Sequence, residues 1–230
     1  MNYTESKDLN PISDKKQISL RCIVPIVEGP GDVQATPILL RKILSERMNC
    51  YDIGIAKPKK AGGRSKLDRR DGIEKFVGHA SRTPGCGGIL ILTDSDDDCA
   101  VEWAQRICVR CAVVGAPVPI AVVCAVREYE NWFLASLESI KGNLIRGNVS
   151  LNEVVENFDQ PEEVGGAKGW ITRQMPQGRA YKETSDQASM TSMIDVSLAY
   201  ANSRSFQRLC HAVEELKVAM EAGSSSITPF

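Results

Sequence analysis

Apolar runs of strand length alternate with amphipathic segments along the first 126 residues of the chain. Predominantly apolar runs occupy residues 18–28, 51–57, 87–93 and 118–126. Segments whose hydrophobic residues recur at helical spacing lie between them, at residues 38–48, 71–81 and 100–112. Strands that are apolar on both faces and joined by helices form parallel sheets covered on two sides. The pattern predicts an α/β fold with a mostly parallel sheet of about four strands and helices on both faces.

The pattern becomes helical beyond Glu130. Helical spacing covers residues 131–140, 168–175, 189–201 and 205–220. Ser205 is placed to cap the last of these segments, and no further strand-like run follows. We therefore expect an α/β domain at 18–135 and a helical C-terminal extension at 136–222 packed on it. The polar, aperiodic ends at 1–17 and 223–230 are expected to be flexible tails.

The first apolar run contains Pro25, which cannot donate a hydrogen bond to a neighbouring strand. Three explanations are open. The strand lies at an edge of the sheet, it carries a bulge at this residue, or it begins there.

The composition is typical of a globular protein, with 230 residues of which 43% are hydrophobic and 25% charged. The net charge is −1, so binding of a polyanion has to come from local clusters of Lys and Arg. The N-terminal residues lack the apolar segment of a secretory signal, and no apolar run reaches the ~20 residues of a membrane span. We expect a cytoplasmic protein that is not attached to a membrane.

Cys108 and Cys111 form a C-x-x-C pair, a spacing that also occurs in redox and zinc sites. The helical spacing of residues 100–112 puts both cysteines on the apolar face of one helix, and the sequence has no second C-x-x-C pair. We therefore expect both to be buried structural cysteines.

Glu28 ends the first apolar run, in the sequence IVPIVEGPGDVQ at 23–34. A glycine–proline turn follows and leads to Asp32, which is suited to capping the next helix. Ligands gather at the carboxyl edge of parallel sheets, so Glu28 is a candidate site residue. The turn lacks the lysine and hydroxyl residue of a Walker loop, which disfavours ATP hydrolysis by this chain alone.

A second acidic motif, TDSDDD, follows the apolar run at 87–93 and begins with Asp94 and Asp96. One interpretation is a solvated loop in which Asp97 or Asp98 caps the following helix. The other is a metal site, because alternate residues of an extended segment face the same side and Asp94 and Asp96 could then chelate one ion. Carboxylate oxygens suit Mg²⁺ or Mn²⁺.

Glu128 and Glu130 follow the fourth apolar run, in VREYENWFLASL. If the backbone stays extended there, both side chains face the same side and are candidates for the metal site or its support. The alternative is an ordinary helix start, where acidic residues interact favourably with the positive end of the helix dipole.

A basic segment, KPKKAGGRSKLDRR, occupies residues 57–70 after the second apolar run. An ordinary solvated loop is one interpretation. An acidic metal site would repel a nucleic-acid backbone, however, unless cations lie nearby. Five residues of the segment are therefore candidates for phosphate contacts, namely Lys57, Lys59, Lys60, Arg64 and Lys66.

The order of these motifs resembles the Toprim domain of topoisomerases, bacterial primases and OLD-family nucleases. The resemblance rests on Glu28 with its G-P-G-D turn and on T-D-S-D-D-D after a later strand, and it covers about residues 20–126. REYENWFL at 127–134 and SRSFQRL near the C-terminus resemble a bacterial family of small Toprim-like proteins found near ATPase genes in phage-defence regions. The implied fold is Rossmann-like.

The resemblance implies a Mg²⁺-dependent nuclease that cleaves phosphodiester bonds in DNA or RNA, with an ATPase as a partner protein. Glu28, Asp94 and Asp96 match the metal-binding residues of Toprim domains, and Asp32 lies near the site in OLD-like relatives. Lys182 is a candidate for the lysine with which OLD-type relatives steady the transition state, although a solvated loop lysine is the simpler interpretation.

Two other functions remain open. A phosphatase of the D-x-D type uses its first aspartate as a nucleophile, but its motif follows the first strand and here it follows the third. A non-catalytic subunit could keep the acidic residues as a metal-stabilised scaffold. The sequence does not predict the oligomeric state.

Overall fold

The computed structural model describes residues 21–147, 149–151 and 158–226. The predicted tail at 1–17 and the last four residues of the one at 223–230 lie outside these ranges. In the described part of the chain, no helix has the length and hydrophobicity needed to cross a membrane.

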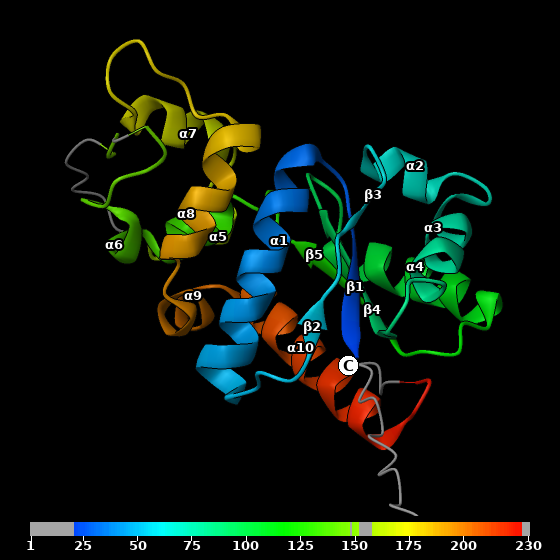
Figure 1. Ribbon diagram of the computed structural model, residues 1–230. Coiled ribbons are helices and arrows are strands. Elements are labelled where there is room, and N and C mark those ends of the chain that lie inside the picture. The colour runs from blue at the N-terminus through cyan, green and yellow to red at the C-terminus, as the bar shows by residue number, and fades with distance from the viewer. Residues whose placement is uncertain (1–20, 148, 152–157, 227–230) are drawn as a thin grey trace, which may run out of the picture.

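A parallel sheet forms the centre of the fold (Figure 1). Its strands are β1 (Cys22–Val27), β2 (Gly54–Ile55), β3 (Lys59–Lys60), β4 (Cys86–Asp94) and β5 (Ile120–Ala125). The order is β2-β1-β4-β5, with β3 also beside β1, and every pair is parallel. The predicted α/β fold is confirmed, although the apolar run at 51–57 yields only the two-residue strand β2, and β3 follows it.

Pro25 lies inside β1, which is a central strand. The β1–β4 register runs through Pro25 without a shift. On the other side of β1, the carbonyls of Ile23 and Val27 accept hydrogen bonds from the amides of Ala56 (3.0 Å) and Ala61 (2.8 Å). By the alternation of a parallel ladder, the missing amide of Pro25 faces the interval between β2 and β3, where no partner strand is present. The proline is accommodated by a break in the neighbouring strand, an explanation that we did not predict.

Helices cover both faces of the sheet (Figure 1). α1 (Pro30–Lys42) and α10 (Arg204–Ala222) lie on one face, and α3 (Gly72–Ser81) and α4 (Ala100–Val114) on the other. Successive strand residues alternate between the two cores, so that Ile23 and Leu90 face α1 and α10, whereas Val24 and Ile89 face α3 and α4. The short helix α2 (Arg64–Asp68) precedes α3.

The chain after β5 is helical, as predicted, but more divided. It contains α5 (Asn131–Ala135), α6 (Leu137–Ile140), a 3₁₀ turn (Pro161–Glu163), α7 (Ala167–Gln174), α8 (Ala188–Met193) and α9 (Val196–Asn202). Two π-helical turns, Ile43–Arg47 and Glu183–Gln187, extend α1 and precede α8. Ser203, not Ser205, caps α10, because its hydroxyl accepts a hydrogen bond from the amide of Phe206 at 3.0 Å.

α10 shares a hydrophobic core with the sheet. Leu209, Val213 and Leu216 on this helix are fully buried in the cluster that also contains Leu90 and Val123 of the strands. The boundary predicted at residue 135 therefore crosses a continuous core.

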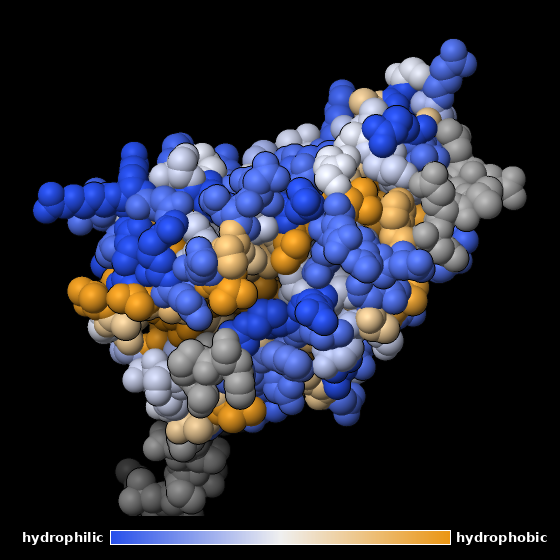
Figure 2. Space-filling model, turned by 180° about the vertical axis from the view of Figure 1, so that it is seen from behind, coloured by the Kyte–Doolittle hydropathy of each residue, from blue (hydrophilic) through white to orange (hydrophobic). Residues whose placement is uncertain are grey.

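The outer face of α4 exposes hydrophobic residues. Val101, Val109 and Val113 are 63%, 68% and 83% exposed, and Figure 2 shows hydrophobic residues gathered on the side where α4 lies. Cys111 is buried but Cys108 is exposed, so the prediction of two buried cysteines is wrong for Cys108. Residues three apart differ by about 60° around an α-helix, and of these two only Cys111 reaches the core.

Substitutions on α10 test whether this helix belongs to the core of the sheet. We expect Leu209→Ala to lower the free energy of unfolding by about 2–5 kcal/mol, because it leaves a cavity between helix and strands. Val218→Ala on the exposed side of the same helix should change it by less than about 0.5 kcal/mol. Urea denaturation measures both, and equal effects would show that α10 is not part of the core.

Candidate functional site

A cavity of about 310 Å³ lies at the carboxyl edge of the sheet. Its charged lining consists of five carboxylates and two lysines. The carboxylates are those of Glu28, Asp32, Asp94, Glu130 and Glu183, and the lysines are Lys60 and Lys168. Glu28 and Asp94 are there because β1 and β4 are parallel neighbours that end side by side.

Main-chain amides hold both oxygens of the Glu28 carboxylate. Oε1 accepts a hydrogen bond from the amide of Asp94 at 3.0 Å, and Oε2 accepts one from the amide of Arg64 at 2.8 Å. Burial raises the pKa of Glu28, and these two hydrogen bonds oppose the rise. Glu28 thereby joins the ends of two strands to the start of α2.

Asp32 both caps a helix and lines the cavity. Its Oδ2 accepts a hydrogen bond from the amide of Gly29 at 2.8 Å, which closes the first turn of α1, and its Oδ1 accepts one from Nε2 of Gln187 at 2.9 Å. Burial raises its pKa. Gly31 permits this approach, because a Cβ atom there would lie 2.0 Å from Oε1 of Gln187.

Asp94 and Asp96 do not face the same side. Oδ1 of Asp94 accepts a hydrogen bond from the amide of Tyr129 at 2.8 Å, and Oδ2 lies 3.8 Å from Nζ of Lys168. Burial, together with the charge of Glu130, raises the pKa of Asp94 well above its usual value. The Asp96 side chain is 70% exposed, because the backbone there has φ of 50° and leaves the extended conformation. The structure therefore does not bring the two carboxylates together as the alternation of an extended segment predicted.

Glu128 and Glu130 also diverge, since the backbone at Arg127 has φ of 60° rather than an extended conformation. Oε2 of Glu128 accepts a hydrogen bond from the amide of Lys168 at 3.1 Å, at the start of α7. Glu128 is thus outside the cavity and caps a helix.

Glu130 is fully buried at the cavity. Its Oε1 accepts a hydrogen bond from the hydroxyl of Tyr181 at 2.8 Å, whereas Oε2 has no hydrogen-bond partner among the described residues. Burial raises the pKa of Glu130 to about 7, against the opposing effect of Lys168. A buried carboxylate oxygen without a donor is costly unless a cation approaches it.

Lys168 lines the cavity, although the sequence pattern did not indicate it as a site residue. Its Nζ lies 2.9 Å from Oε1 of Glu183, 3.7 Å from Oε2 of Glu130 and 3.8 Å from Oδ2 of Asp94. Burial disfavours the ammonium, but these carboxylates outweigh it and raise the pKa of Lys168. Lys182 is exposed and does not line the cavity. In the sequence, Lys168 is distinguished only by its position at the start of the helix predicted over 168–175.

The basic segment divides into two groups. Lys60 lines the cavity, while Lys57 and Lys66 are exposed and Lys59 is half-buried. The Arg64 side chain is engaged in contacts within the protein. Its guanidinium donates hydrogen bonds to the carbonyls of Asp94 (3.1 Å) and Ser95 (2.5 Å) and pairs with Asp98, so it is not available as a phosphate contact.

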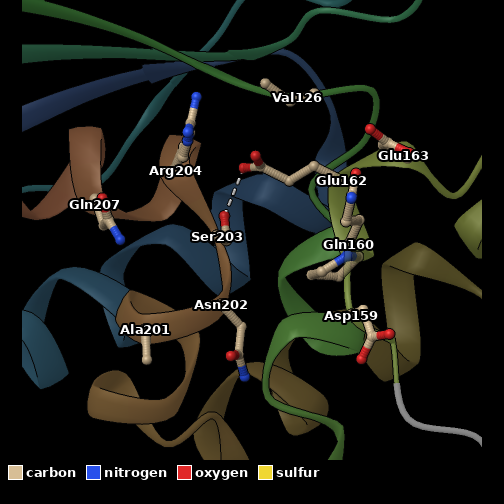
Figure 3. Close-up of a pocket in the computed structure, with 11 residues that line it drawn as sticks. Val126, Asp159, Gln160, Glu162, Glu163, Ala201, Asn202, Ser203, Arg204 and Gln207 are labelled. Atoms are coloured by element: carbon tan, nitrogen blue, oxygen red, sulfur yellow. Dashed lines mark hydrogen bonds between the residues drawn. The ribbon is translucent and has the colours of Figure 1, made fainter.

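A larger cavity, of about 630 Å³, lies between the 3₁₀ turn and the start of α10. Figure 3 shows Glu162 reaching Ser203 within it. Oε1 of Glu162 accepts hydrogen bonds from the hydroxyl of Ser203 (2.6 Å) and the amide of Ser205 (2.7 Å). The carboxylate of Glu162 in this larger cavity is therefore engaged at the N-terminus of α10. The acidic cavity is the stronger candidate site.

The family model for a domain of unknown function, DUF4276, matches residues 27–214 of this chain. This span is well over half of the 230 residues. The chain belongs to the DUF4276 family. No curated protein and no solved structure matches it. All the charged residues that line the acidic cavity of this DUF4276 protein, from Glu28 to Glu183, fall within the matched span.

The described part of the DUF4276 chain contains no group of three acidic, histidine or cysteine side chains that converge closely enough to hold a metal ion by themselves. The donor chemistry nevertheless suits Mg²⁺. This ion keeps several waters and usually takes only one or two protein carboxylates together with substrate phosphates. Oε2 of Glu130 accepts no hydrogen bond from the described residues, and Oδ2 of Asp94 lies 3.8 Å from Nζ of Lys168, so both oxygens could bind a cation.

The pH dependence of stability tests the state of Glu130. Its pKa in the folded protein is about 7, above the ordinary value of 4.5, so the folded state loses stability as pH rises from about 4.5 through 7. In EDTA we expect Glu130→Gln to remove about 1–3 kcal/mol of the loss between pH 5 and pH 8.

Glu138→Gln, at an exposed glutamate on α6, is the matched control and should keep the wild-type dependence. Urea denaturation at a series of pH values measures the effect. A Glu130→Gln protein with the wild-type slope would contradict the raised pKa.

Proposed function

We propose that this DUF4276 protein is a Mg²⁺-dependent phosphodiesterase, a nuclease that acts on DNA or RNA. The observation that supports this function best is the charge of the cavity, where five carboxylates face two lysines. Burial raises the pKa of four of these carboxylates, Glu28, Asp32, Asp94 and Glu130. A site that concentrates hard oxygen ligands at such a cost is suited to a divalent cation.

Glu28, Asp94 and Glu130 are the residues that would hold the ion. When bound, Mg²⁺ neutralises charge that develops on the phosphate oxygens during phosphodiester cleavage. The main-chain amides that hold Glu28, and the amide of Tyr129 that holds Asp94, fix both carboxylates before substrate arrives. Such preorganisation removes the need to reorient ligands during the reaction.

Lys168 and Lys60 would bind the substrate phosphate. Nζ of Lys168 has three carboxylates around it and lies at the cavity wall, where the ammonium would pair with a phosphate oxygen of the substrate. Glu128 accepts a hydrogen bond from the amide of Lys168 and so fixes the position of the first turn of α7. In this proposal Lys168 takes the transition-state role that the sequence had suggested for Lys182.

The exposed position of Asp96 disfavours a D-x-D phosphatase. Such an enzyme requires both aspartates at the reacting phosphate, but the Asp96 side chain is 70% exposed and lies 3.7 Å from Nη1 of Arg64, outside the cavity. The proposed partners rest on the Toprim resemblance alone. They are nucleic acid and an ATPase, with a role in phage defence.

Substitutions within and beside the cavity test the proposed nuclease. We expect Asp94→Asn, Glu28→Gln and Lys168→Met each to reduce Mg²⁺-dependent cleavage by about 10²-fold or more, because each removes a charge that acts on the reacting phosphate. Asp96→Asn and Lys217→Met, at positions that do not line the cavity, should retain activity within about threefold. Labelled single-stranded DNA, duplex DNA and RNA serve as substrates, and circular dichroism checks the fold.

Loss of cleavage in Asp96→Asn together with normal cleavage in Asp94→Asn would contradict this assignment. A wild-type protein that binds Mn²⁺ but cuts none of the three substrates would favour a non-catalytic metal-binding subunit.

A further inference from the structure

The basic residues of this nearly neutral chain are concentrated in two segments. Residues 57–70 contain seven Lys and Arg and one acidic residue, and residues 164–182 contain four Lys and Arg and no acidic residue. The two segments thus hold eleven of the 28 basic residues of the chain but only one of its 29 acidic residues. The remainder of the chain has a net negative charge, so a polyanion approaches more favourably near these segments.

Both segments border the acidic cavity, although about a hundred residues separate them in sequence. The first contributes Lys60, Gly62 and Gly63 to the lining, and the second contributes Lys168. Figure 1 shows β3 and α2 on one side of the N-terminal end of α1, and α7 on the other side. The cavity therefore has a basic bank on each side, which we call the 57–70 bank and the 164–182 bank.

The 164–182 bank carries charges that the protein does not use internally. Arg173 and Lys182 are exposed and form no ion pair with any described residue. Arg179 anchors the bank instead. Its Nη2 lies 2.7 Å from Oδ1 of the buried Asp186, whose Oδ2 accepts a hydrogen bond from the amide of Lys182 at 2.9 Å. The backbone that bears Lys182 is thus held in place while its ammonium stays free.

We infer that the 164–182 bank is a second nucleic-acid contact surface and that a bound strand crosses the acidic cavity from one bank to the other. This inference rests on the proposed function in one respect, that nucleic acid is the ligand. The recognised chemistry is the phosphate backbone, since the aromatic residues of the bank, Trp170 and Tyr181, are buried and do not offer stacking surfaces. Binding is expected to be independent of base sequence.

Binding measured without cleavage tests the second bank. The probe is a fluorescein-labelled 20-nucleotide single strand, followed by anisotropy in EDTA over a series of salt concentrations. We expect Arg173→Ser/Lys182→Ser to weaken binding several-fold and to reduce the slope of log K against log salt by about 1.4, because two phosphate contacts are lost. Lys57→Ser/Lys66→Ser on the other bank should have a similar effect.

The matched control is Arg41→Ser/Lys217→Ser, which removes two positive charges at the opposite end of α1 and on the C-terminal half of α10. It should keep the wild-type affinity and slope. If Arg173→Ser/Lys182→Ser behaves like this control while Lys57→Ser/Lys66→Ser binds weakly, the second bank is overturned and the proposed nuclease stands.

If the wild type binds the strand through both banks but no divalent cation supports cleavage, the second bank stands and the proposed nuclease fails. If the wild type does not bind the strand, or a duplex of the same length, in low salt, the second bank is overturned.

Discussion

Five carboxylates meet at the carboxyl edge of the sheet, and their mutual repulsion is the constraint that governs the arrangement around them. Lys168 provides the nearest compensation, with its ammonium within 4 Å of Asp94, Glu130 and Glu183. It cannot satisfy all of them, and Oε2 of Glu130 is left without a hydrogen bond from the described residues. Such a site is stable only with partial protonation, with added cations or with strong support from surrounding main-chain amides.

Much of the surrounding structure provides that support. The amides of Asp94 and Arg64 hold Glu28, the amide of Tyr129 holds Asp94, and the hydroxyl of Tyr181 holds Glu130. These donors come from segments distributed between residues 64 and 181, so the site exists only in the complete fold. The buried packing of α10 against β4 and β5 serves the same end, because it fixes the strands whose carboxyl ends carry the acids.

Glu28 and Asp94 could be predicted from the sequence because each ends an apolar strand, and parallel neighbours bring their ends together. Asp96 and Glu128 were misplaced because Asp96 and Arg127 adopt positive φ, which breaks the alternation that the prediction assumed. Neither position is a glycine that would signal such a turn. Lys168 and Glu183 could not be predicted, since they reach the cavity through the packing of helices far along the chain.

The break between β2 and β3 beside Pro25 could not be predicted either. It is a property of the neighbouring strand and not of the sequence around the proline. Local pattern therefore predicted the parallel sheet and the residues at its strand ends. It did not predict the groups that complete the cavity from the opposite side.

Anomalous diffraction from crystals soaked in Mn²⁺ would show whether the acidic cavity binds a divalent cation. We expect an anomalous peak inside the cavity, within reach of Glu28, Asp94 and Glu130, that is lost in Glu28→Gln/Asp94→Asn crystals. A cavity without a peak at high Mn²⁺ concentration, or a peak only at the exposed loop of Asp96 to Asp98, would contradict this expectation.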